Sequence, residues 1–237
     1  MQDCSSELQA QWTEFQTDNA SKVIEEDSFV VDDLVLVGGL DISFDKNDET
    51  RACAYITVYN ILSEAIVYEA YEVCTLTVPY ISGYLGFREI AFYLPLLEKL
   101  RQTEYFPQLL MVDGFGVLHH RGFGSACHIG VVLDIPTIGI GKTLLCMDGL
   151  DESVVKNSFR SQCKAVGDFI YLQGADPQRR VYGAALKSAG NCINPIFVTV
   201  GHKISLATAI ALTVKTSKYR IPEPIRNSDI KSKPPLL

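Results

Sequence analysis

The sequence lacks any run of about 20 apolar residues, the length that an α-helix needs to cross a bilayer. The N-terminal stretch MQDCSSELQAQWTEFQTDNASK is polar, so it also lacks the apolar centre of a secretory signal. We therefore expect neither a membrane partner nor secretion. The hydrophobic fraction of 47% and the charged fraction of 21% are those of an ordinary globular protein.

The seven cysteines lack the close spacing of a zinc site, and their number is odd. We interpret them as reduced thiols of a cytoplasmic protein, with the nucleus or nucleolus as further locations. Positive charge is also scarce, because the formal net charge is −7. This balance argues against a broad basic surface for nucleic acid. It leaves room for a local basic groove and suits metals that neutralise clustered carboxylates.

The first half of the chain predicts a β-meander followed by a βαβ unit. Residues 34–44, 52–59 and 65–77 are rich in β-branched and aromatic residues and are joined by short polar connections, which indicates antiparallel strands. A helix of about five turns is predicted from Gly83, with Pro95 as a candidate kink. A strand at 109–112, a helix at 124–134 and a strand ending at Lys142 follow, and this order is typical of parallel strands.

The second half is less regular. Residues 146–168 predict one helix and loops, and strand patterns return at 169–172, 181–186 and 196–200. Ser205 is expected to cap a helix over 206–215. Pro222 and Pro224 predict an extended tail over about 219–237. We expect one α/β domain over residues 1–237, with a polar segment over about 1–30.

Two acidic residues interrupt apolar stretches. Asp41 lies inside LVLVGGLDISF, where an unpaired charge would be costly. A partner cation, or a bend after Gly38 and Gly39, is the structural alternative to a bound metal. Asp113 ends a buried strand, which is where open α/β sheets collect ligands.

Other polar residues have simpler alternatives. Glu89 follows Arg88 in the first half of an apolar helix, where an ion pair at the helix start is the alternative. Asp229 lies in the tail, where a solvated surface acid is the simpler interpretation. His119 and His120 are adjacent, so their side chains point in different directions on a regular element. We therefore favour no metal-ligand role for this pair.

A meander followed by a parallel strand resembles the ribonuclease H arrangement, in which the first and fourth strands are neighbours. Asp41 and Asp113 would then face each other across one cleft, where two carboxylates repel unless a divalent cation lies between them. Oxygen ligands suit Mg²⁺ or Mn²⁺. The chemistry that fits is metal-assisted hydrolysis of a phosphodiester.

The chain resembles the endonuclease V family of inosine-directed nucleases in six long motifs: VGGLDISF, VPYISGYLGFRE, VDGFGVLHHRGFGSACHIGV, PTIGIGK, VGHKISLATAIALT and YRIPEP. These motifs follow the family's order over residues 35–230. The resemblance implies a ribonuclease H-like α/β fold, with a mixed central sheet flanked by helices. It also implies Mg²⁺ as the cofactor, with Mn²⁺ as a substitute.

The resemblance assigns roles to individual residues. It implies that Asp41, Glu89 and Asp113 are catalytic metal ligands, that Asp229 is a further ligand, and that Lys142 is the active-site lysine. The implied substrate-binding residues form a wedge and a base pocket: Pro79, Tyr80, Ile81, Ser82, Gly83, Leu85, Gly114, His119, Gly124 and Ser125.

Two of these assignments have structural alternatives. Glycines would let the backbone approach the hypoxanthine base closely, so enlarging Gly114 or Gly124 to valine is expected to block inosine. The alternative is that the glycines serve turns and helix packing. For Tyr80, the alternative to stacking on a nucleotide is a place in the core.

Ser82 and the doubled histidine of HHRG resemble the animal members, which are associated with inosine-containing RNA. We therefore expect a monomeric, magnesium-dependent endoribonuclease that cuts single-stranded RNA at the second phosphodiester 3′ to inosine. The same hydrolysis of DNA at deoxyinosine or other deaminated bases is the alternative, and a non-catalytic inosine-binding module is a third reading. His119 is a candidate for reading the 2′-hydroxyl, which distinguishes RNA from DNA.

Overall fold

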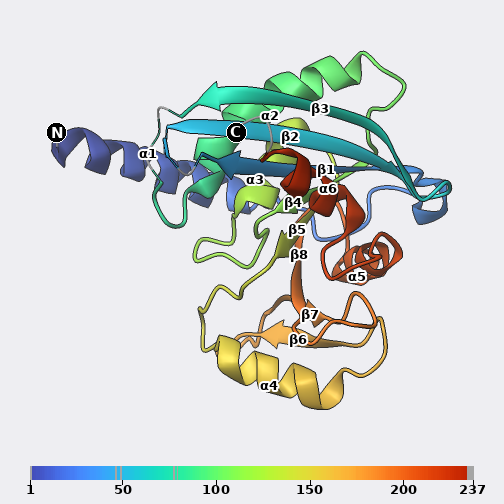
Figure 1. Cartoon of the computed structure of the whole chain (residues 1–237). Coiled ribbons are helices and arrows are strands. Elements are labelled where there is room, and N and C mark those ends of the chain that lie inside the picture. Colours follow the sequence, from blue (N-terminus) through green and yellow to red (C-terminus); the bar gives the residue numbers. More distant parts are fainter. Residues whose placement is uncertain (1, 46, 49, 77, 79, 234–237) are drawn as a thin grey trace.

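The computed structural model describes residues 2–45, 47–48, 50–76, 78 and 80–233, with side chains from Ser6 onward. Within this part of the chain eight strands form one sheet in the order β3-β2-β1-β4-β5-β8-β7-β6 (Figure 1). The strands are β1 (Leu36–Phe44), β2 (Arg51–Asn60), β3 (Ala65–Thr75), β4 (Leu109–Asp113), β5 (Thr137–Gly141), β6 (Phe169–Gln173), β7 (Val181–Leu186) and β8 (Ile196–His202). The helices are α1 (Gln2–Ala20), α2 (Leu85–Arg101), α3 (Ser125–Leu133), α4 (Glu152–Gln162), α5 (Leu206–Lys215) and α6 (Glu223–Lys231).

The pairing confirms the expected ribonuclease H-like arrangement. β1, β2 and β3 form an antiparallel meander, whereas β1 pairs with β4, and β4 with β5, in parallel. In the β1–β4 register, Leu40 is the partner of Val112. Asp41 and Asp113 each lie one residue beyond this pair, so neighbouring parallel strands carry the two acids at the same level.

Alternating side chains on β4 divide the core between the two faces of the sheet. Leu110 and Val112 pack in one cluster with residues of α2 and α3. Leu109 and Met111 belong to a second cluster that includes residues of α5 and Ile225 of α6. This period of two is what a strand buried on both faces requires.

The predicted extended tail is wrong, because residues 223–231 form α6. Pro222 is the residue before the helix and Pro224 lies in its first turn, where no intrahelical N–H bond is needed. The Ser228 hydroxyl donates to the Gly39 carbonyl (2.8 Å), and the Thr57 hydroxyl donates to the Pro224 carbonyl (2.7 Å). A Cβ atom at Gly39 would overlap the backbone of Pro224, so this glycine lets α6 approach β1 closely.

The polar N-terminal segment also contains more structure than its composition indicates, since α1 occupies residues 2–20. Its aromatic side chains pack on α2, where Trp12 stacks on Phe87 with ring centroids 5.0 Å apart. No helix in the described part of the chain is long and apolar enough to cross a membrane.

Candidate active site

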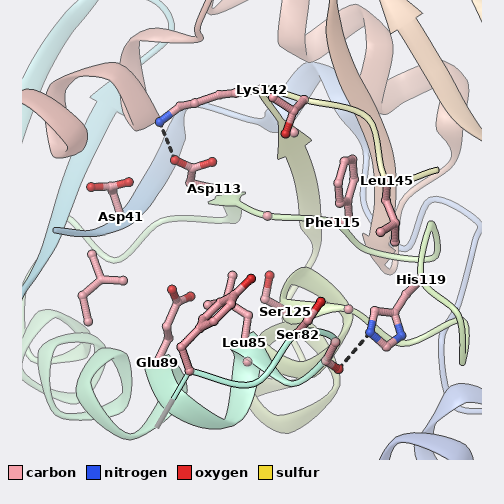
Figure 2. A pocket seen from close by; sticks show the side chains of 18 of the residues that line it. Asp41, Ser82, Leu85, Glu89, Asp113, Phe115, His119, Ser125, Lys142 and Leu145 are labelled. Atoms are coloured by element: carbon pink, nitrogen blue, oxygen red, sulfur yellow. Dashed lines mark hydrogen bonds and ion pairs between the residues drawn. The ribbon is translucent and has the colours of Figure 1, made fainter. Parts of the chain in front are cut away.

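A pocket of about 470 Å³ lies beside β1 and the C-terminal ends of β4 and β5. We call it the acidic pocket, because Asp41, Glu89 and Asp113 line it together with Lys142 (Figure 2). Seven of the predicted substrate-binding residues also line it: Ser82, Gly83, Leu85, Gly114, His119, Gly124 and Ser125. Tyr80 lines it as well, whereas Ile81 and Asp229 do not. Pro79 lies outside the described residues.

Asp41 projects from the middle of β1 and is only 4% exposed. The Ser232 hydroxyl, just beyond α6, lies 3.1 Å from its Oδ2 atom. Burial, followed by repulsion from Asp113, raises the pKa of Asp41 to about 7, although the charge of Lys142 acts in the opposite direction. The strand continues through this residue, so the alternative of a bend after Gly39 is wrong.

Glu89 is 3% exposed in the second turn of α2. Burial, together with the charges of Asp113 and Asp41, raises its pKa well above the usual value, and the charge of Arg88 does not offset this. Its Oε2 atom is buried without a hydrogen-bond partner among the described residues. The Arg88 guanidinium lies over the Phe44 ring, 4.6 Å from its centroid. Glu89 therefore presents a buried oxygen to the pocket.

Lys142 follows β5 and is the cation of the acidic pocket. Its Nζ atom lies 2.6 Å from Asp113 Oδ2 and 3.7 Å from Asp229 Oδ1. Burial lowers the pKa of Lys142, but the charges of Asp113, Asp229 and Asp41 outweigh burial, so the net pKa is raised. Asp229 also pairs with Lys233 at 3.1 Å. Lys142 thus connects α6 to the carboxylates of the sheet.

The donor set of the acidic pocket fits a hard divalent cation. Its acids come from β1, α2 and β4, and carboxylate oxygens are the ligands that Mg²⁺ prefers. The unpartnered Glu89 oxygen and the repulsion between Asp41 and Asp113 would both be relieved by a cation. Over the described ranges, however, no three acidic, histidine or cysteine side chains already surround a single point.

The turn before α2 forms the rim of the pocket. Tyr80 is 64% exposed, so the alternative that it is a core aromatic is wrong. Gly83 has a φ angle of 83°, which favours glycine. Its carbonyl oxygen lies 3.0 Å from His119 Nε2 and accepts a 2.8 Å hydrogen bond from the Arg121 guanidinium. The loop that follows β4 therefore holds this turn in place through the Gly83 carbonyl.

Gln16 of α1 is a pocket residue that the sequence did not reveal. It is 3% exposed, and its amide nitrogen donates to the carbonyls of Gly83 (3.1 Å) and Phe123 (3.0 Å). Its side-chain oxygen accepts a 2.6 Å hydrogen bond from Arg121 Nε. A glutamine in a polar segment carries no pattern that distinguishes it from a surface residue, so only the tertiary structure identifies it.

Gly114 and Gly124, two of the glycines that line the pocket, differ in what surrounds them. A Cβ atom at Gly124 would overlap the Phe115 carbonyl, so this glycine is required for the packing of the α3 start. Gly124→Val would therefore force this backbone to move, so a loss of inosine cleavage in that variant would not by itself reveal a base pocket. Gly114 has a φ angle of 150°, and a Cβ atom there would meet the Ser125 hydroxyl oxygen.

Comparisons with known proteins agree with these features. A family model described as Endonuclease V matches residues 17–230. Human endonuclease V is 44% identical over 199 residues, which cover 83% of this chain and 70% of the human protein. The mouse protein is 44% identical over 199 residues, which cover 83% of this chain and 58% of the mouse protein.

A solved structure of Ciona intestinalis endonuclease V has the same fold, with a TM-score of 0.92 at 33% identity. The match covers 97% of this chain and 98% of that one. The Ciona protein was crystallised in complex with a 24-mer DNA that contains an inosine followed by a ribo-adenosine.

Proposed function

Because this chain belongs to the endonuclease V family, with relatives of the animal type, we propose that it is a metal-dependent endoribonuclease. It cuts single-stranded RNA at the second phosphodiester on the 3′ side of inosine. The observation that carries this proposal is the convergence of Asp41, Glu89, Asp113 and Lys142 on one pocket rimmed by the exposed Tyr80.

Asp41, Glu89, Asp113 and Asp229 would hold Mg²⁺, or Mn²⁺ in its place. When bound, the metal supplies positive charge that makes water a better nucleophile and polarises the phosphate. Lys142 brings a second positive charge to the same carboxylates, where it can stabilise the negative charge that develops on the phosphate oxygens. The Ser232 hydroxyl donates a hydrogen bond to Asp41 and thereby orients its carboxylate.

The base would enter between the Gly83 turn and the start of α3. Hypoxanthine presents an O6 acceptor and an N1–H donor, and it lacks the 2-amino group of guanine. The Gly83 carbonyl is already hydrogen-bonded, so it is not the group that reads N1–H. Gly114, Ser125 and Leu85 line the pocket, and we assign to them the close contact that rejects a 2-amino group.

The alternative substrate, DNA with deoxyinosine, is favoured by one specific observation. The Ciona relative was crystallised with a DNA strand, although that strand carries a ribo-adenosine after its inosine. His119 lines the pocket and remains our candidate for sensing a 2′-hydroxyl. Its Nε2 atom contacts the Gly83 carbonyl and its Nδ1 atom accepts from the Arg121 N–H, so a 2′-hydroxyl would have to replace one of these partners.

Cleavage of paired RNA and DNA oligonucleotides, each with one inosine, tests the proposal. We expect RNA to be cut faster than DNA in Mg²⁺, at the second phosphodiester, and neither to be cut in EDTA. RNAs with guanosine or adenosine in place of inosine are the matched controls. Faster cutting of DNA would favour the repair alternative, and binding without cutting in Mg²⁺ would favour the non-catalytic module.

A further inference from the structure

A second pocket, of about 340 Å³, lies next to the acidic pocket and shares His119 and His120 with it. We call it the arginine pocket, because Arg121 and Arg180 line it. Glu25, which follows α1, and Tyr182 of β7 also line it. The His119–His120 pair therefore borders both pockets.

The arginine pocket is cationic in a chain whose formal net charge is −7. Glu25 is the one acidic residue among its described lining residues. The Arg121 guanidinium is fixed by Gln16 and Gly83 and lies 4.4 Å from the centroid of the Tyr84 ring. It is therefore a positioned charge rather than a mobile one.

Arg180 is held more loosely than Arg121. Its side chain is 44% exposed, and its guanidinium pairs with the equally exposed Glu25 at 3.0 Å. It lies 5.4 Å from the centroid of the Tyr182 ring. Exposed pairs of this kind contribute little stability, so a phosphate can replace the Glu25 carboxylate without disturbing the fold. An arginine beside an aromatic ring is a combination that binds single-stranded nucleic acid by charge and stacking.

The position of the arginine pocket sets which side of the inosine it would meet. In Figure 2, Asp41 and Asp113 lie at one end of the acidic pocket and His119 lies at the other. The bond to be cut is on the 3′ side of the inosine, so the strand runs toward the carboxylates in its 3′ direction. The strand beyond His119 is therefore the 5′ side.

We propose that the arginine pocket binds the nucleotide on the 5′ side of the inosine, with Arg180 on its phosphate and the Tyr182 ring beside its base. This inference rests on the proposed function and adds a second nucleotide subsite to it. Glu25 holds Arg180 in place when no strand is bound and gives way to the phosphate when one is.

The test compares an RNA that begins with inosine and an RNA with three nucleotides before the inosine. Both are titrated by fluorescence anisotropy with Ca²⁺ in place of Mg²⁺. We expect the wild-type chain to bind the extended RNA more tightly. Arg180→Gln should weaken binding of the extended RNA about tenfold and leave binding of the short RNA unchanged. For the extended RNA it should also reduce the slope of log affinity against log salt concentration by about one, which corresponds to the loss of one phosphate contact.

Arg179→Gln is the matched control, because Arg179 is exposed, adjacent and outside the lining of the arginine pocket. We expect it to leave the difference between the two RNAs unchanged. Glu25→Gln should increase affinity for the extended RNA alone. Equal losses with Arg179→Gln and Arg180→Gln, or equal losses on both RNAs, would show general charge attraction and overturn the subsite. Absence of inosine-dependent cleavage by the wild-type chain would overturn the proposed function instead. The two failures are distinguishable, because the subsite is tested by the binding of the two RNAs and the proposed function by cleavage.

Discussion

The ammonium nitrogen of Lys142 lies 2.6 Å from the Oδ2 atom of Asp113. Lys142 directly follows β5 and Asp113 ends β4, and these strands are parallel neighbours, so the sheet brings the two side chains to the same edge. The carboxylate of Asp113 is thereby shared between a lysine and the site proposed for the metal. The charge balance of the site therefore depends on how β4 and β5 are paired.

Lys142→Met is expected to lower the turnover number about 100-fold, because it removes the charge placed to stabilise the phosphate in the transition state. Binding of inosine RNA should fall less. Single-turnover cleavage and anisotropy measure the two effects separately. Lys218→Met removes a surface lysine that pairs with Glu64 and is the control. A loss confined to affinity would make Lys142 a phosphate anchor only.

Asp41→Asn is expected to abolish most cleavage and to leave the fold intact. The amide is the same size as the carboxylate and keeps an oxygen for Ser232, but it loses the charge that would hold the metal. The variant should lose Mg²⁺ affinity by calorimetry while its unfolding free energy in EDTA stays equal or rises, because a buried charge has been removed. Near-normal activity at saturating Mg²⁺ would contradict the assignment.

Tyr80→Ala is expected to weaken RNA binding by about 1–3 kcal/mol, the usual contribution of stacking a base on an aromatic ring. The melting temperature should stay unchanged, because the ring is 64% exposed. Tyr171→Ala, on the distant β6, removes a ring that is 59% exposed and should change neither quantity. Similar affinity losses in both variants would argue against a wedge role for Tyr80.

Gln16→Met is expected to increase the Michaelis constant for inosine RNA and to reduce discrimination against guanosine RNA. It removes the amide that ties α1 to Gly83 and Phe123, and it leaves buried carbonyls with fewer donors. A stability loss of about 1–3 kcal/mol should accompany this change. Thr17→Val, one residue along on the exposed side of α1, is the comparison. Unchanged selectivity in Gln16→Met would make the residue a structural link alone.

His128 is expected to make the protein less stable in mild acid. It is 4% exposed among Phe15, Phe87 and Phe123, and burial lowers its pKa to about 4. Between pH 6.5 and 4 the unfolded chain takes up a proton at this residue and the folded chain does not, so stability falls as the pH falls. The loss amounts to about 3 kcal/mol by pH 4.

Urea denaturation at a series of pH values measures this contribution. His128→Leu should show a shallower loss of unfolding free energy over the same range, because the titrating group is gone. The remaining slope would come from other groups, including His119, whose pKa is also lowered to about 4 by burial. An identical slope in the variant and the wild-type chain would contradict the assignment to His128.

The order of the strands, the helices between them, the parallel pairing of β4 with β5 and the Ser205 cap were determined by local patterns in the sequence, whereas α1 and α6 were not. Periodicity and turn residues act over a few positions, so they can be read without knowing the fold. Asp41 was conspicuous for the same reason, since a charge within an apolar strand is costly wherever that strand lies. The family motifs added Glu89 and Asp229, which local patterns alone left ambiguous.

Only the tertiary structure decided what depends on contacts between distant segments. α6 forms despite its prolines because Pro222 precedes it and Pro224 falls in its first turn. Thr57 and Gly39, more than 160 residues earlier, also hold it through hydrogen bonds to Pro224 and Ser228. Gln16 acquires its role from Gly83 and Phe123, which lie far along the chain. Gly124 is needed because of the Phe115 carbonyl that faces it. A side chain's own type specifies what bonds it can make, but the partner that completes each bond is supplied by the folded chain.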